Sequence, residues 1–294
     1  MADRTYFVDT AMPANKKKRG RRKTHAVFDG SRVFSIRRLT ELKDAGEVYI
    51  DAMFPQIYEE LMELIEKGVK VFSLRNTRIL KRFREENGVE KSDEADAKLL
   101  GIIPRSCFKQ LTAREICLLK LIGEYEMHVR WGKIIRQWMQ ICPLDSFKES
   151  VKELRCIANR YARKIIEEIK SDEGYATTYR LACDMLGIRD SVEAAILVAK
   201  LPLSWKLSRL KGLLGLTPDK DKKNYNHRLR GHLSKLAVVI YINNRRHGTG
   251  ARLFENMNHI SKNKVFYMLQ LRILKILKRA WQQWQKQHML AGGQ

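Results

Sequence analysis

The chain lacks the paired cysteines that zinc sites and disulfide-rich folds require. Its five cysteines form no CxxC and no CxxH pair, so the usual structural zinc patterns are excluded. An odd number of cysteines in a protein without such pairs is typical of reducing conditions, under which thiols stay reduced and mostly buried. We therefore expect a fold that depends on its hydrophobic core rather than on a metal or a disulfide.

Long apolar runs are missing as well. No stretch approaches the length needed to span a bilayer. The first residues, "MADRTYFVDT", contain Asp3, Arg4 and Asp9 and no apolar signal-peptide core. We expect a cytoplasmic protein with no membrane partner. At 294 residues with 44% hydrophobic residues, the chain suits one large domain or two ordinary ones.

Acidic residues are few beside the basic ones. The 57 Lys and Arg against 33 Asp and Glu give a formal net charge of +24, which favours a polyanionic partner such as DNA. The densest basic segment is "NKKKRGRRKTH", which carries Lys16, Lys17, Lys18, Arg19, Arg21, Arg22 and Lys23. A nuclear localisation patch is one interpretation. The place of this segment between two predicted strands favours contact with phosphates instead.

The first hundred residues alternate between strand and helix patterns. Short apolar runs predict strands over 5–11, 25–30, 31–36, 47–52 and 69–74, with a hairpin turn at Asp29-Gly30-Ser31. Ile57, Leu61, Leu64 and Ile65 repeat at helical spacing and predict a helix over 55–68. We therefore expect an α/β domain with a mixed sheet over residues 1–105.

After Pro104 the pattern becomes helical. Residues 112–142 and 145–174 each read as one long helix, broken at Pro143. The pair predicts an antiparallel hairpin or coiled coil over residues 106–180, a linker or dimerisation arm, although two helices of a compact bundle would give the same pattern. Residues 181–294 predict a helical C-terminal domain that ends in one long helix.

Four aspartates fall at positions that suit a two-metal site. Asp9 lies in the first predicted strand and Asp51 at the end of the fourth, while Asp93 and Asp96 stand three apart, on one face of a predicted helix that Ser92 would cap. Carboxylates are the ligands that Mg²⁺ prefers, and two such ions serve phosphoryl displacement. Taken alone, the pair Asp93 and Asp96 could equally be a solvated helix start. Glu47, an alternative second acid, lies further back on its strand.

The stretch from Lys91 to Ala97, "KSDEADA", matches the motif K-[ST]-D-x-x-D-A. The sequence thereby resembles the IS-one-ten (Piv/MooV) family of DEDD insertion-sequence transposases, whose first domain is similar to the Holliday-junction resolvase RuvC. The resemblance implies an RNase H-like (RuvC-like) catalytic domain in which Asp9, Asp51, Asp93 and Asp96 bind Mg²⁺. Asp51 stands where the family usually has Glu, and the Thr-Gly that normally follows is absent.

The resemblance extends into the C-terminal half. The stretch "LGIRDSVEAAILVAKLP" is similar to a helix-hairpin-helix-like piece that holds phosphates by backbone N–H groups, although it is also an ordinary core turn in form. The stretch from Gly215 to Pro218 matches the family's G-L-x-P block. The Ser-Gly pair that should follow, and that supplies the nucleophile, is missing. Either Tyr225 or Ser234 takes that role, or the acids cut alone, or the protein binds nucleic acid without recombining it.

The family resemblance implies a DNA recombinase that is guided by a structured bridge RNA, assembles as a homodimer or homotetramer and associates with the nucleoid. The residues expected to contact nucleic acid in the second half are Lys222, Lys223, Arg228, Arg230 and Lys235. Basic residues of the terminal helix, among them Arg272 and Lys278, extend this expectation. Two alternatives stay open: a catalytically inactive nucleic-acid-binding derivative of a transposase, and a RuvC-like structure-specific endonuclease.

Overall fold

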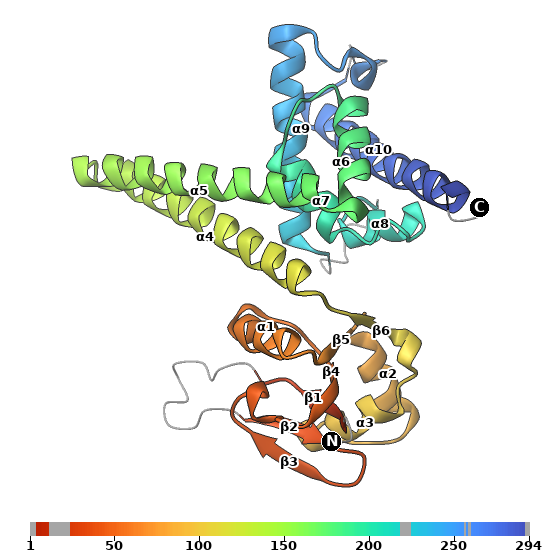
Figure 1. Cartoon of the computed structure of the whole chain (residues 1–294). Coiled ribbons are helices and arrows are strands. Elements are labelled where there is room, and N and C mark those ends of the chain that lie inside the picture. Colours follow the sequence, from red (N-terminus) through yellow and green to blue (C-terminus); the bar gives the residue numbers. More distant parts are fainter. Residues whose placement is uncertain (1–3, 12–23, 218–224, 256, 258–259, 292–294) are drawn as a thin grey trace. The chain divides into compact units, whose positions relative to one another are not determined.

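The computed structural model describes residues 4–11, 24–217, 225–255, 257 and 260–291, of which 288–291 are described by their backbone only. The chain divides into two compact units, Met1–Gly123 and Glu124–Gln294. Residues 106–123 fall in the first unit, and the rest of the predicted linker, 124–180, falls with the C-terminal helices. Each unit is described by itself below (Figure 1).

A mixed six-stranded sheet forms the centre of the first unit. Its order is β3-β2-β1-β4-β5-β6, in which β1, β4 and β5 run parallel and the others pair antiparallel. The strands are β1 (Arg4–Asp9), β2 (His25–Phe28), β3 (Val33–Ile36), β4 (Ala45–Ile50), β5 (Lys70–Leu74) and β6 (Phe108–Gln110).

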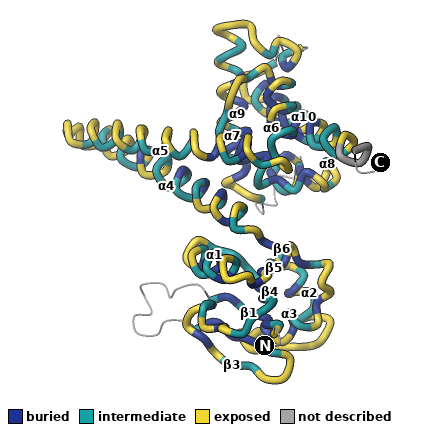
Figure 2. The backbone as a smooth tube through the Cα atoms, viewed as in Figure 1, coloured by how far each residue is buried: buried dark blue, intermediate teal, exposed yellow. Residues whose placement is uncertain are grey.

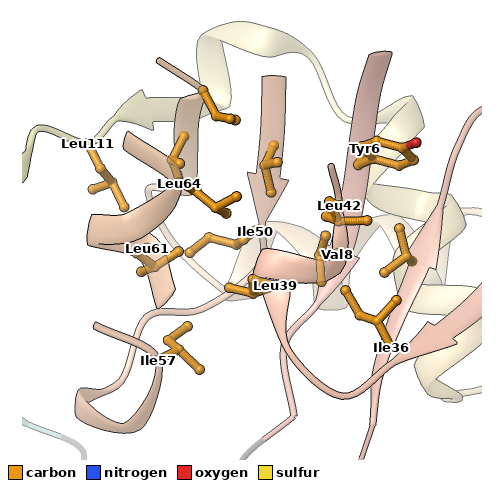
Figure 3. Close-up of a cluster of buried hydrophobic side chains, with 14 of the residues drawn as sticks. Tyr6, Val8, Ile36, Leu39, Leu42, Ile50, Ile57, Leu61, Leu64 and Leu111 are labelled. Carbon is orange, nitrogen blue, oxygen red and sulfur yellow. The ribbon is translucent and has the colours of Figure 1, made fainter. Parts of the chain in front are cut away.

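The two faces of the sheet are both buried. Because side chains alternate along a strand, Val8 and Ile50 point to one face, which α1 (Tyr58–Glu66) and the 3-10 helix η1 (Leu39–Glu41) cover, as Figure 3 shows. Phe7 and Tyr49 point to the opposite face. This second face packs against α2 (Arg78–Glu86) and α3 (Asp93–Ile102).

Several local predictions for the first unit are confirmed. The hairpin between β2 and β3 turns at Gly30, whose φ is 95°, and Asp29 accepts hydrogen bonds from the backbone of Ser31 and Arg32. Ser92 caps α3 by accepting a hydrogen bond from Ala95 N. The pattern did not predict β6, because a strand of three residues is too short for an alternation to be read.

The second unit is helical. Its helices are the C-terminal part of α4 (Ala113–Ile141), then α5 (Asp145–Ser171), α6 (Glu173–Leu186), α7 (Val192–Lys200), α8 (Leu207–Leu213), α9 (His227–His247) and α10 (Lys262–Ala291), with the 3-10 helix η4 (Ala251–Phe254). α4 and α5 run antiparallel, since the ring of His128 stacks on that of Tyr161 at 5.6 Å and Gly132 faces Leu154. Much of this hairpin is exposed (Figure 2).

The core of the second unit lies where α5, α6, α7, α9 and α10 meet. The turn between α6 and α7 depends on Gly187, whose φ is 65°, and a Cβ at that position would lie 3.1 Å from the backbone N of Gly250. This close approach fixes the turn against the loop that follows α9. In the described part of the chain, no helix has the length and apolar character needed to cross a bilayer.

The expectation that most cysteines are buried is wrong. Cys117, Cys142 and Cys156 are exposed, and only Cys183 is buried. Cys117 lies on α4, Cys142 directly follows α4, and Cys156 lies on α5. These long helices leave one face to solvent.

Candidate metal centre and nucleic-acid contacts

Strand geometry brings Asp9 and Asp51 together. β1 and β4 are parallel neighbours, so their carboxyl ends lie at the same edge of the sheet. Asp51 follows directly on β4, and its N–H donates to Val8 O at 3.3 Å. Alternation then places both aspartates on the side of the sheet that carries Phe7 and Tyr49. Glu47 shares that side but lies further back, where it accepts a hydrogen bond from the Tyr49 hydroxyl.

Helix α3 supplies the other two acids. It packs against β1 and β2 through Leu99 and Leu100, which are buried. Gly101 allows the close approach, because a Cβ there would already lie 3.3 Å from the ring of Phe28. Asp96 faces inward and is 5% exposed, whereas Asp93 is exposed at the start of the helix.

The electrostatics of this edge reflect four acids in one place. The pKa of Asp9 is raised to about 8, first by burial and then by the charges of Asp51, Asp96 and Asp93, with a further contribution from a hydrogen bond to Asp51. Burial also raises the pKa of Asp96, against the opposing charges of Arg84 and Lys91. The two predicted halves of the acidic site are therefore close enough to interact.

Two further residues of this site were not predicted. The backbone N and the hydroxyl of Thr10 lie 2.8 Å and 2.6 Å from Oδ1 of Asp51, so this carboxylate is held by its neighbouring strand. Arg84, in the last turn of α2, places Nε 3.0 Å from Oδ1 of Asp96. Thr10 directly follows Asp9, which is a signal that could have been read, but nothing in the sequence connects Arg84 to Asp96.

His25 closes the same edge from β2. It is buried, its Nδ1 accepts a hydrogen bond from Ala11 N at 3.1 Å, and burial lowers its pKa. A neutral imidazole with Nδ1 as acceptor satisfies both observations. His25 therefore fixes the chain just after β1 without adding a positive charge beside the acids.

The donor set suits Mg²⁺ in its chemistry. It consists of carboxylate oxygens alone, and Oδ1 of Asp96 is buried without a hydrogen-bond partner in the structure. In the described segments, however, no three His, Cys, Asp or Glu side chains are grouped as the ligands of one metal ion.

The two candidate nucleophiles lie in the second unit. The ring of Tyr225 packs over Gly215, where a Cβ would come within 2.7 Å of the tyrosine Cγ, and its centroid is 4.1 Å from that of His227. Tyr225 therefore has a packing role whatever its chemistry. Ser234 is half-buried on α9, two residues after the buried His232.

The residues predicted to contact nucleic acid differ in how far other groups of the protein already engage them. Arg228 is 75% exposed, with Glu126 at 3.7 Å, whereas Arg230 donates from Nη1 to Leu214 O at 3.2 Å. Lys235 lies 3.5 Å from Glu193. The remaining predicted contacts fall outside the described residues: Lys16, Lys17, Lys18, Arg19, Arg21, Arg22, Lys23, Lys222 and Lys223.

Two basic residues of the terminal helix hold backbone carbonyls. Arg272 donates to Leu253 O and Glu255 O, and Lys278 donates to Leu203 O. These contacts fasten α10 to the loops around it. Both residues therefore have a structural role, whereas the sequence pattern predicted only that they contact nucleic acid.

In the turn between α6 and α7, which resembles a helix-hairpin-helix piece in sequence, some backbone N–H groups donate hydrogen bonds within the protein. The N–H groups of Gly187 and Ile188 donate to carbonyls of α6, and that of Ser191 donates to the Tyr179 hydroxyl. Asp190 is paired with Lys170 at 2.8 Å. The N–H groups of Arg189 and Asp190 have no such backbone partner among the described residues.

The second unit contains a buried polar cluster that was not predicted from the sequence. His232, 4% exposed, lies between Glu193 on α7 and Glu126 on α4, and the Tyr125 hydroxyl donates to Glu193 at 3.0 Å. Lys200 and Lys235 flank the two glutamates. The cluster ties the base of the α4–α5 hairpin to α7 and α9.

No protein-family model matches the chain, and no curated protein matches it. The resemblance carried by the segment from Lys91 to Ala97 therefore stays a prediction.

Proposed function

We propose that the protein is a Mg²⁺-dependent DNA recombinase of the transposase type, whose first unit is an RNase H-like, RuvC-like catalytic domain. The observation that carries the proposal is the meeting of Asp9 and Asp51, at the ends of adjacent parallel strands, with Asp96 of α3. The formal net charge of +24 supports a nucleic-acid substrate. A mixed sheet with helices on both faces supports the fold assignment.

The proposed chemistry places the acids around a scissile phosphate. Asp9, Asp51, Asp93 and Asp96 would hold two Mg²⁺ ions, which when bound supply charge stabilisation for the attacking and leaving oxygens. Thr10 orients the Asp51 carboxylate through one oxygen, as outer partners of metal ligands commonly do. Burial of Asp96 against the sheet keeps it from turning out to solvent.

The decisive experiment replaces one acid. Asp96→Asn should abolish Mg²⁺-dependent strand cleavage and leave DNA affinity nearly unchanged, because it removes a metal ligand and not a phosphate contact. Glu94→Gln, an exposed change on the same helix turn, is the matched control and should cleave like the wild type. Equal cleavage by Asp96→Asn would exclude the metal site.

A catalytically inactive nucleic-acid-binding derivative is the second candidate. It is favoured by the packing of Tyr225, a candidate nucleophile, over Gly215. This candidate predicts salt-dependent DNA binding by the wild type with no cleavage in Mg²⁺ or Mn²⁺. Mg²⁺-dependent cleavage of DNA by the wild type would exclude the inactive derivative.

A RuvC-like endonuclease differs from a recombinase with a side-chain nucleophile in that it forms no covalent protein–DNA intermediate. A recombinase that uses Tyr225 or Ser234 should form a denaturant-resistant protein–DNA adduct that disappears with Tyr225→Phe or Ser234→Ala. Cleavage of branched DNA without any adduct would favour the endonuclease. An adduct that survives both substitutions would mean that another residue is the nucleophile.

We also propose RNA and self-association as parts of this function. A guide RNA should copurify with the protein and be lost on ribonuclease treatment. Self-association is supported by an apolar row on α4, formed by Met127, Trp131, Ile134, Trp138 and Ile141. The row repeats at alternating steps of four and three, the spacing of a coiled-coil seam, and Trp138 and Ile141 are 61% and 85% exposed. Trp138→Glu should shift the sedimentation of the wild-type dimer or tetramer to that of a monomer.

A further inference from the structure

Arg84 makes an unusual contact with the acidic site. Its Nε lies 3.0 Å from Oδ1 of Asp96, and the two side chains are 19% and 7% exposed. Both atoms are nevertheless buried without a hydrogen bond that meets normal geometry. The contact is therefore electrostatic, and no directed hydrogen bond between these two atoms fixes its geometry.

This pair differs from an ion pair that mainly stabilises a fold. Arginine and carboxylate usually meet through parallel, directed hydrogen bonds when they are buried together. Neighbouring basic residues of α2 behave in the ordinary way, since Lys81 and Arg82 pair with Glu85 and Glu86 one turn along on the exposed face. Arg84 alone among these three turns inward to the acids.

We propose that Arg84 is an internal counter-ion that competes with a divalent metal ion for Asp96. The inference rests on the proposed metal site and concerns how that site is regulated. Without metal, the guanidinium neutralises the buried carboxylate. Metal binding displaces it, because two cations cannot share one carboxylate oxygen without strong repulsion.

The side chain has the freedom that this exchange requires. Arg84 belongs to the last turn of α2, and the chain turns directly afterwards at Gly88, whose φ is 61°. The Arg84 side chain is 19% exposed, and no directed hydrogen bond from Nε holds it to Asp96. Swinging the long side chain toward solvent therefore breaks a charge contact and leaves the helix in place.

Competition makes two predictions of opposite sign for Arg84→Gln. The Mg²⁺ dissociation constant, measured by calorimetry with the metal alone, should fall about tenfold. This is the size expected for removing one nearby unit charge from a partly buried site. The melting temperature without metal should fall, because Asp96 loses its counter-ion. A residue that merely shaped the site would lower both the melting temperature and the metal affinity.

Three variants complete the design. Arg82→Gln removes an exposed charge from the same helix and should leave the Mg²⁺ affinity unchanged. Arg84→Lys keeps the charge and should stay near the wild type. Asp96→Asn should abolish binding in every background. If Arg84→Gln does not fold without metal, Mg²⁺ should restore its circular dichroism spectrum, and failure to do so overturns the proposal.

The outcomes separate the two levels of inference. Tighter Mg²⁺ binding by Arg84→Gln alone supports the competition. Wild-type binding that Asp96→Asn abolishes, but that Arg84→Gln leaves equal or weaker, retains the metal site and overturns the role of Arg84. Metal binding that is absent from the wild type and from Arg84→Gln overturns both.

Discussion

The Nε2 atom of His232 lies 3.0 Å from Oε1 of Glu126, a residue 106 positions away in the chain. The other ring nitrogen contacts Glu193. Burial alone would lower the pKa of His232, but the hydrogen bonds to Glu126 and Glu193 more than offset it and the pKa is raised. The pKa of Glu126 is lowered although burial opposes this, chiefly because His232 binds it.

This pair predicts how stability depends on pH. Because the folded pKa of His232 is raised, its contribution is complete below the unfolded value of about 6.5 and is lost as the pH rises through the folded pKa. Because the pKa of Glu126 is lowered, its contribution is lost as the pH falls below about 4.3 and through the folded pKa. The cluster should therefore stabilise the fold most between these limits.

Replacing His232 tests the pH dependence. His232→Gln should lower the free energy of unfolding by about 3 kcal/mol near pH 6, measured by urea denaturation, and by less at pH 9. His247→Gln, an exposed change at the end of the same helix, should have little effect at either pH. A difference between wild type and His232→Gln that did not change with pH would contradict a charged His232.

Replacing Thr10 tests how Asp51 is oriented. Thr10→Val keeps the side-chain volume but removes the hydroxyl that lies 2.6 Å from Asp51. Mg²⁺-dependent cleavage should fall about 10- to 100-fold, as it does when outer partners of metal ligands are lost. Thr10→Ser keeps the hydroxyl and should retain most of the activity. Similar losses in both variants would point to packing rather than to the hydrogen bond.

Gly215 and Gly212 form a matched pair for the packing of Tyr225. Gly215→Ala should destabilise the protein by about 2 kcal/mol or more, because φ is 62° and the new Cβ would meet the tyrosine ring. Gly212→Ala enters open space on α8 and should be neutral or stabilising by up to about 1 kcal/mol. Adding Tyr225→Ala should relieve part of the Gly215→Ala loss; thermal denaturation of the single and double variants measures this relief.

Arg228 and Arg230 should separate nucleic-acid binding from stability. Arg228→Gln should weaken DNA binding and reduce the slope of log affinity against log salt by about 1, with little change in melting temperature. Arg230→Gln should lower the melting temperature, because its guanidinium holds the Leu214 carbonyl. Binding curves at several salt concentrations, beside thermal denaturation, distinguish the two. The reverse pattern would mean that Arg230 is the phosphate contact.

Much of the local structure could be predicted because it depends on neighbours in the sequence. The turn at Asp29-Gly30, the cap at Ser92 and the amphipathic helix α1 each rest on contacts within a few residues. The sequence also placed Asp9 and Asp51 on two apolar strands, but only the structure shows that these strands are parallel neighbours, so that both acids lie at one edge of the sheet.

The sequence by itself determined the acids, the basic excess and the order of the first five strands and of the long helices. Only the tertiary structure decided what these side chains touch: Arg84 beside Asp96, Thr10 beside Asp51, and His232 between two glutamates. Such contacts join elements that are distant along the chain, so no local pattern fixes them. They depend on strand register and helix packing, which the whole hydrophobic core sets at once.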